Sequence, residues 1–117
     1  MDTVSVDTVA IITFDPGQEE YDLGKIKEGL HIALEYNFTN TGKVPLDIEL
    51  VTACKCAELD WTRGKIMPGE KGVINVLYDS RGEKLNRSIK KDITIIANTE
   101  PIVTLAYFTV YVEPKVD

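Results

Sequence analysis

The most constraining feature of this sequence is an alternation of apolar and mostly polar residues with a period of two. Leu30, Ile32, Leu34, Tyr36 and Phe38 are the apolar members of this run. Successive side chains of a strand point to opposite faces of its sheet, so the pattern predicts a half-buried β-strand. A sheet with one buried face and one solvent-exposed face is typically antiparallel.

A second alternating segment follows after a short run of turn residues. Residues 40–43 read Asn-Thr-Gly-Lys, and residues 46–50 read Leu-Asp-Ile-Glu-Leu. Glycine in the first run is free to adopt a positive φ, which favours a turn. We therefore expect residues 30–51 to form a hairpin-like pair of strands with a short connection.

Runs rich in β-branched residues between turn signals indicate further strands, at residues 4–14, 21–26, 73–78, 89–97 and 102–112. No stretch of helical period competes, and residues 57–61 leave room for one short turn at most. Strands without intervening helices make no parallel βαβ units, so the sheets are expected to be antiparallel and packed face to face. The sequence therefore predicts an all-β fold, an immunoglobulin-like antiparallel β-sandwich of about seven strands, in one domain over residues 1–117.

Composition excludes several classes of protein. The chain has 13 Lys and Arg against 19 Asp and Glu, a net charge of −6, which argues against nucleic acid as a partner. The longest nearly apolar stretch, residues 102–112, is too short for a transmembrane helix, which needs about 20 residues. No basic segment leads from Met1 into an apolar one, so any signal segment is expected to lie outside this sequence.

The residue inventory does not support catalysis. His31 is the only histidine, and the alternation places it on the polar face of a strand. Two cysteines and one distant histidine do not make a zinc site, and there is no glycine-rich phosphate loop. We therefore expect no catalytic residue, no cofactor and no enzymatic activity.

Cys54 and Cys56, with Lys55 between them, are the residues of this sequence most able to carry redox or metal chemistry. Residues i and i+2 of a strand lie about 6.6 Å apart at Cα, so a disulfide here requires a bend or bulge. A second interpretation is a pair of thiolates that hold a soft metal such as Cu(I). A third is structural, with one cysteine packed as a small apolar residue and the other lining a loop.

The last strand is apolar on both sides. Ala106, Phe108, Val110 and Val112 share one face with Ile102, and the other face carries the candidate interaction surface Val103, Leu105, Tyr107 and Tyr111. One face is expected to form core, while the other is covered by the N-terminal segment or contacts another chain or domain. Trp61, the only tryptophan, caps the end of the core or anchors a partner.

The strand, turn and cysteine motifs, taken in their order along the chain, resemble those of the bacterial DUF1573 family, which is similar to the ASPM-SPD-2-Hydin and major-sperm-protein domains. The carrying segments are residues 21–29 (Tyr-Asp-Leu-Gly-Lys-Ile-Lys-Glu-Gly), 36–42, 45–48, the Cys54-Lys55-Cys56 triplet, 66–72 and 76–79. Together they span about residues 20–112. The family usually has glycine between the two cysteines and threonine after the second, whereas this chain has Lys55 and Ala57.

The resemblance implies an immunoglobulin-like fold and an exported protein, either periplasmic or on the cell surface, often lipid-anchored through a segment outside this sequence. It attaches no enzymatic activity, and an oxidising compartment favours a Cys54–Cys56 disulfide. The leading hypothesis is a noncatalytic binding or scaffolding module for a protein partner or a neighbouring domain. The alternatives are a redox-active or Cu(I)-handling protein that uses Cys54 and Cys56, and a carbohydrate-binding module that uses exposed aromatics such as Trp61 and Tyr111.

Overall fold

The computed structural model describes residues 9–115, which contain nine strands and no helix. The strands are β1 (Ile12–Phe14), β2 (Glu20–Lys27), β3 (His31–Asn40), β4 (Leu46–Thr52), β5 (Ala57–Trp61), β6 (Lys65–Ile66), β7 (Lys71–Asp79), β8 (Ser88–Ala97) and β9 (Val103–Glu113). The first part of the strand predicted at residues 4–14 lies outside the described residues. The predicted all-β fold is confirmed, and the two strands beyond the expected seven are β5 and the two-residue β6.

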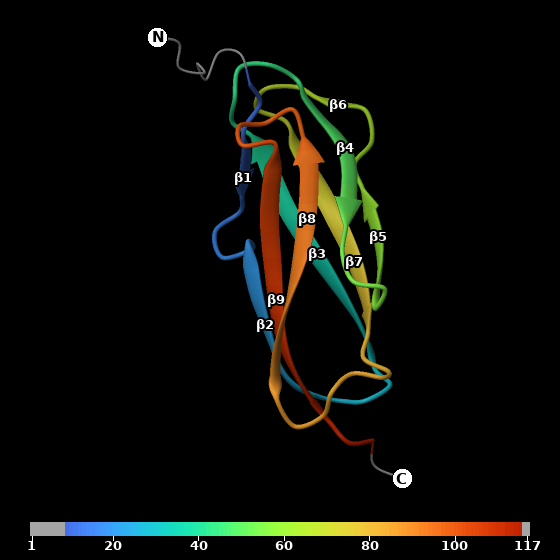
Figure 1. Cartoon of the computed structure of the whole chain (residues 1–117). Helices are drawn as coiled ribbons and strands as arrows, with labels where there is room; N and C mark the ends of the chain where they lie inside the picture. Colours follow the sequence, from blue (N-terminus) through green and yellow to red (C-terminus); the bar gives the residue numbers. More distant parts are fainter. Residues whose placement is uncertain (1–8, 116–117) are drawn as a thin grey trace.

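Two sheets pack face to face in an elongated sandwich (Figure 1). The first sheet has the order β1-β3-β7-β5 and the second β2-β9-β8-β4-β6. The body measures 59 × 28 × 24 Å along its principal axes. β3 and β7 form the centre of the first sheet, and β9 and β8 the centre of the second, so the most regular alternating segments of the sequence are the central strands.

The predicted hairpin of residues 30–51 is wrong, because β3 and β4 belong to different sheets. β3 pairs with β1 and β7, whereas β4 pairs with β8 and β6. The connection between them crosses from one sheet to the other close to residues 9–11. A Cβ at Gly42 would lie 2.8 Å from the carbonyl oxygen of Val9, so only glycine fits there without movement of the backbone.

The expectation of purely antiparallel sheets is also wrong, since β2 and β9 are parallel. Glu20 pairs with Tyr107, and Lys27 pairs with Glu113. Parallel neighbours need a long connection, and here the rest of the sandwich supplies it, because the two strands come from opposite ends of the chain. No βαβ unit is required.

Residues 57–61, where the sequence left room for one short turn, form the strand β5, which pairs with β7 along its whole length. Ala57, Leu59 and Trp61 alternate with the exposed Glu58 and Asp60. The inward residues pair with Tyr78, Val76 and Ile74 of β7, all of which are buried. The period of two was therefore present in the sequence, but over only five residues.

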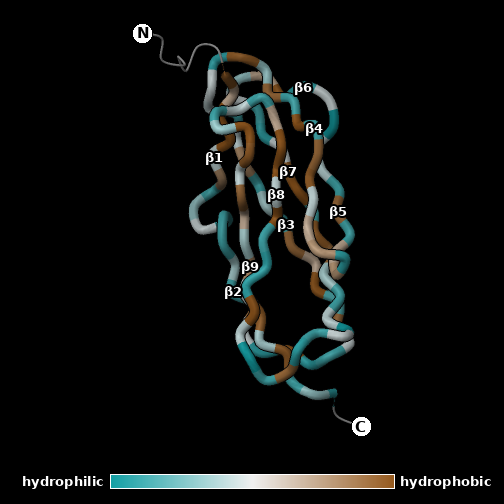
Figure 2. The backbone as a smooth tube through the Cα atoms, viewed as in Figure 1, coloured by the Kyte–Doolittle hydropathy of each residue, from teal (hydrophilic) through white to brown (hydrophobic). Residues whose placement is uncertain are grey.

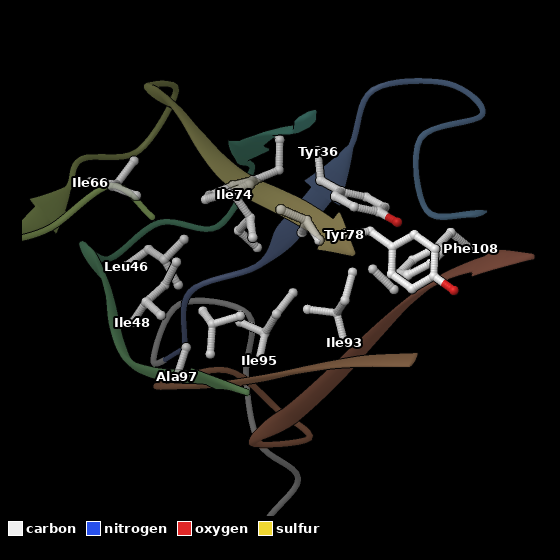
Figure 3. Packing of buried hydrophobic residues seen from close by; sticks show 14 of the residues in the cluster. Tyr36, Leu46, Ile48, Ile66, Ile74, Tyr78, Ile93, Ile95, Ala97 and Phe108 are labelled. Carbon is white, nitrogen blue, oxygen red and sulfur yellow. The ribbon is translucent and has the colours of Figure 1, made fainter. Parts of the chain in front are cut away.

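The core lies between the sheets and is built from the inward residues of β3, β4, β7, β8 and β9. Figure 3 shows Tyr36, Tyr78 and Phe108 gathered at one end of this core and Leu46, Ile48 and Ile66 at the other. One face of β9 forms core, as expected, because Ala106, Phe108, Val110 and Val112 are fully buried. Ile102, which the sequence pattern grouped with them, precedes the strand and is 59% exposed. Figure 2 shows β2 as mostly hydrophilic, whereas hydrophobic segments follow the upper parts of β8 and β9.

Candidate interaction surface and disulfide site

The outer face of the second sheet carries apolar residues in register across three strands. Leu50 of β4 pairs with Ile96 of β8, and Ile96 pairs with Val103 of β9. The next row runs from Thr52 through Thr94 to Leu105. We call Leu50, Ile96, Ile102, Val103 and Leu105 the apolar patch.

A β-bulge is the reason that Leu50 belongs to this patch. The alternation in the sequence groups Leu50 with Leu46 and Ile48, both of which are buried. The register with β8 shifts between Ile48 and Leu50, so one extra residue is accommodated and the alternation reverses. Glu49 and Leu50 are both exposed as a result, and Val51 takes the inward position.

Exposure of the apolar patch is unusual within the part of the chain that the structure describes. Eight large apolar side chains are strongly exposed there, and four of them, Leu50, Ile102, Val103 and Leu105, belong to the patch. Scattered single exposed residues need no explanation, but a contiguous group is typical of a contact site. Ile102 also lines a surface depression together with Asp47 and Glu49, so the patch has an acidic rim.

The edge of β9 is open beside the patch. Among the described residues, β2 pairs with β9 only from Tyr107 onward, whereas β8 pairs with β9 from Val103. The backbone of β9 from Val103 to Ala106 therefore has a ladder partner on one side only. Such an edge is able to accept an additional strand.

The other predicted members of the interaction surface lie in different surroundings. Tyr107 is half-buried, and the Lys90 ammonium lies 4.4 Å from the centroid of its ring and 3.5 Å from Glu20 Oε2. Tyr111 is half-buried, with the Lys25 ammonium 5.4 Å from its ring centroid. The outer face of β9 thus changes from apolar at Val103 to charged and aromatic at Tyr111.

Trp61 lies in the first sheet and not with the β9 residues. Its half-buried indole packs against the core, and the guanidinium carbon of Arg63 lies 3.7 Å from the ring centroid. Trp61 and Tyr111 belong to different sheets. They do not form the shared aromatic platform that carbohydrate binding would use.

A disulfide joins Cys54 and Cys56 in the connection between β4 and β5. The chain turns there, and the two Cα atoms are 5.1 Å apart, closer than the spacing of an extended strand. The backbone of the turn is fixed at both ends, because Ala57 N donates to Cys54 O at 3.3 Å and Asp79 N donates to Cys56 O at 2.8 Å. The turn is the bend that a bridge between these positions requires.

The disulfide adds little to the stability of the fold. In the chain-entropy model, a loop of three residues gives only about 1.6 kcal/mol, whereas a loop of 15 residues gives about 3 kcal/mol. The two sheets already share a continuous core. A purely structural purpose therefore explains this bond poorly.

His31 lies beside Cys56, which the sequence pattern did not indicate. His31 pairs with Asp79 across β3 and β7, and Asp79 N donates to Cys56 O, so the three residues form one row. They line a depression of about 130 Å³ with Lys55, Glu58 and Arg81. The predicted exposure of His31 on the polar face is confirmed, but its neighbours come from strands distant in sequence.

Asp79 is the electrostatic centre of this depression. The Arg81 guanidinium donates to both carboxylate oxygens, with Nη2 2.6 Å from Oδ2, and His31 Nε2 lies 3.4 Å from Oδ2. Hydrogen bonds from the Arg81 side chain and backbone lower the pKa of the Asp79 carboxyl to about 2. The carboxylate is therefore charged at neutral pH, and it holds the Arg81 guanidinium in place beside the His31 imidazole.

Cys54 faces a second depression, on the outer side of the other sheet. This depression has a volume of about 370 Å³, and Thr52, Lys90, Asp92 and Thr94 line it with Cys54. The disulfide therefore lies between the two depressions, and Cys54 lines the larger one while Cys56 lines the smaller one. Within the described residues, no group of three or more His, Cys, Asp or Glu side chains is arranged to hold a metal ion.

Within residues 9–115, no helix is long and apolar enough to cross a membrane.

The two packed sheets define an immunoglobulin-like β-sandwich with an apolar patch on one face and a disulfide at one edge. The sequence matches the family model described as protein of unknown function (DUF1573) over residues 12–112. The chain therefore belongs to the DUF1573 family, as its sequence motifs indicated.

The solved structures that are similar in fold include the following three. A protein of unknown function from Porphyromonas gingivalis W83 has a TM-score of 0.72 and 18% identity, over 92% of this chain and 49% of that one. The ASH/PapD-like domain 7 of human CEP192 has a TM-score of 0.59 and 10% identity, over 99% and 92%. The CsuC–CsuE chaperone–tip adhesion subunit complex of Acinetobacter baumannii has a TM-score of 0.54 and 16% identity, over 89% and 53%.

This chain spans about half the length of the Porphyromonas and Acinetobacter chains that it matches. At such identities the likeness shows the fold alone. A comparison of the sequence with curated proteins gives no match.

Proposed function

We propose that this domain is a noncatalytic binding module of an exported bacterial envelope protein, and that its apolar patch docks a protein partner. The single observation that carries the proposal is the row Leu50–Ile96–Val103, which extends over three paired strands with Leu50 and Val103 each 44% exposed. Burial of such a row against a partner removes apolar area from water, at about 25 cal/mol per Å².

The chemistry of the patch argues for a partner that is not a second copy of this chain. Asp47 and Glu49 flank the patch, and the whole chain carries a net charge of −6. Two copies would bring like charges together around the same apolar centre, which costs affinity. The complementary partner is a protein surface or neighbouring domain with apolar residues and a basic rim.

The open edge of β9 supports a mode of binding in which the partner adds a strand. Backbone groups of residues 103–106 supply hydrogen bonds, while the Val103 and Leu105 side chains supply an apolar face. The similar fold in a chaperone–adhesin complex is consistent with assembly between proteins. The Cys54–Cys56 disulfide suits an oxidising compartment outside the cytoplasm.

The proposal is tested by photo-cross-linking in cells that produce the whole protein. A cross-linking side chain is placed at position 103, and the matched control carries it at Leu77, which is 39% exposed on the outer face of the other sheet. We expect a single protein, or a defined segment of the same chain, to be linked from position 103 and not from position 77. The variant Glu49→Arg is expected to reduce this cross-link, because it places positive charge against the partner's basic rim.

Two results would contradict the proposal. One is an equal set of cross-links from positions 103 and 77, which would mean that the patch has no special affinity. The other is a cross-link from position 103 to a second copy of the same chain that survives Glu49→Arg.

A further inference from the structure

The Cys54–Cys56 disulfide separates two surface depressions, one lined by each cysteine. We propose that this bond is a thiol–disulfide exchange site, in which a dithiol attacks Cys54 and the Cys56 sulfur leaves beside His31. The substrate class is a small molecule or protein that carries two thiols. This activity is independent of the docking role, because it needs neither Leu50 nor Val103.

The arrangement of the two hollows supports the direction of attack. Displacement at a disulfide requires the attacking and leaving sulfurs to lie on opposite sides of the sulfur under attack. Cys54 lines the depression of about 370 Å³, where an incoming group has room, and the charged side chains that line it are Lys90, Lys91 and Asp92. Cys56 lines the smaller hollow on the opposite side, so its sulfur is the leaving group.

The charges around Cys56 favour its release as a thiolate. The charged side chains that line its hollow are His31 of β3, Asp79 of β7, Glu58 of β5, and Lys55 and Arg81 from the connecting loops. The two carboxylates and the two permanent cations balance one another. The net charge of the side chains around Cys56 therefore depends on whether His31 is protonated. A protonated imidazole stabilises a thiolate beside it.

The exchange proceeds in two balanced steps. The substrate's first thiolate attacks Cys54 Sγ, the Cys54–Cys56 bond breaks, and its electron pair stays on Cys56 Sγ, which takes a proton from protonated His31. The substrate's second thiolate then attacks the substrate sulfur in the mixed disulfide, and the electron pair goes to Cys54 Sγ, which takes a proton from water. The dithiol is oxidised to a disulfide by two electrons, and the two cysteines are reduced to thiols.

The first experiment identifies which sulfur carries the mixed disulfide. The reduced variants Cys56→Ser and Cys54→Ser are each incubated with glutathione disulfide, and the adduct is followed by intact mass while circular dichroism reports folding. By reversibility, Cys54 is the external thiol and Cys56 the internal one, so Cys56→Ser should accumulate the adduct at least tenfold faster. Faster reaction of Cys54→Ser, or equal rates, would overturn the assignment.

The second experiment tests His31 on the intact protein. Reduction by dithiothreitol is followed by alkylation and intact mass at pH 6.5, under conditions where the protein stays folded. We expect His31→Gln to slow reduction about tenfold, because the leaving sulfur loses its proton donor. His31→Lys is expected to restore most of the rate, and the control Lys65→Gln, on β6, to leave it unchanged.

Two results would end the proposal. One is a disulfide that resists dithiothreitol as long as the chain is folded. The other is an unchanged rate in His31→Gln, which would show that the leaving sulfur does not depend on the imidazole.

Discussion

Asn40 Nδ2 donates a hydrogen bond to the carbonyl oxygen of Ile66 at 2.9 Å and thereby links the end of β3 to β6 of the opposite sheet. The same buried side chain donates to Val44 O at 2.8 Å. Its Oδ1 accepts from Gly42 N at 3.0 Å and from Ile11 N at 3.3 Å. One side chain thus satisfies four backbone groups at the point where the chain crosses between the sheets.

Asn40→Ala should destabilise the domain by about 3 kcal/mol or more, because buried backbone donors and acceptors lose their partners. Asn40→Asp should also be harmful at neutral pH, since a carboxylate accepts from Gly42 and Ile11 but donates to neither carbonyl. Urea denaturation measures both effects. The control is Asn75→Ala on the exposed face of β7, which should change stability by less than about 0.5 kcal/mol. Equal behaviour of Asn40→Ala and Asn75→Ala would remove Asn40 from this structural role.

The β-bulge in β4 predicts that deletion of Glu49 is tolerated. Ile48 points inward, Glu49 and Leu50 outward and Val51 inward, so a chain without Glu49 keeps regular alternation and the same register. We expect a folded protein whose melting temperature falls by about 5 °C, the effect of roughly 1 kcal/mol.

Deletion of Thr94 is the matched comparison, because β8 pairs with β9 in an unbroken register at that position. The loss of one residue there turns Ile95 and Ala97 outward and should prevent folding. Melting followed by circular dichroism distinguishes the two deletions. Similar damage from both would mean that the bulge does not set the orientation of Leu50.

The sequence predicted the strands whose alternation is long. The inner faces of β3, β8 and β9 follow from residues such as Tyr36, Ile93 and Phe108, because the period of two repeats often enough to exclude a helix. β5 was missed because five residues give the alternation little weight. Leu50 was assigned to the wrong face because a bulge leaves no signal in a single sequence.

Contacts between segments that are distant in the chain could not be predicted from the sequence. A strand with one apolar face reads the same whether its neighbour follows in the same sheet or lies across the core, so the separation of β3 from β4 was not visible. The position of His31 beside Cys56 depends on the pairing of β3 with β7 and the contact of Asp79 with Cys56. Neither relationship has a local pattern, whereas the cysteine pair itself was visible as a chemical candidate.

Asp79 should contribute to the acid sensitivity of the domain. Its pKa in the folded protein is lowered from 3.8 to about 2 by the hydrogen bonds from Arg81. A lowered folded-state pKa gives stability that is present above about pH 4 and is lost as the pH falls through about 2. Thermal melting between pH 2 and pH 6 should show a deficit in Asp79→Asn at pH 6 that shrinks toward pH 2. A deficit that stays constant over this range would mean that the carboxylate charge is not the cause.

The double variant Cys54→Ser/Cys56→Ser should remain folded, with a loss of about 1 to 2 kcal/mol in the free energy of unfolding. The bridge closes only a short loop, and neither cysteine is among the fully buried core residues, although Cys56 packs against their edge. Ile95→Ala, which removes a fully buried side chain, is the comparison and should cost about 3 kcal/mol. Urea denaturation of the two variants gives this ranking directly. A loss in the double variant as large as that of Ile95→Ala would make the disulfide a structural staple, whereas a small loss means that the sandwich stays folded when the bond is open, which an exchange site requires.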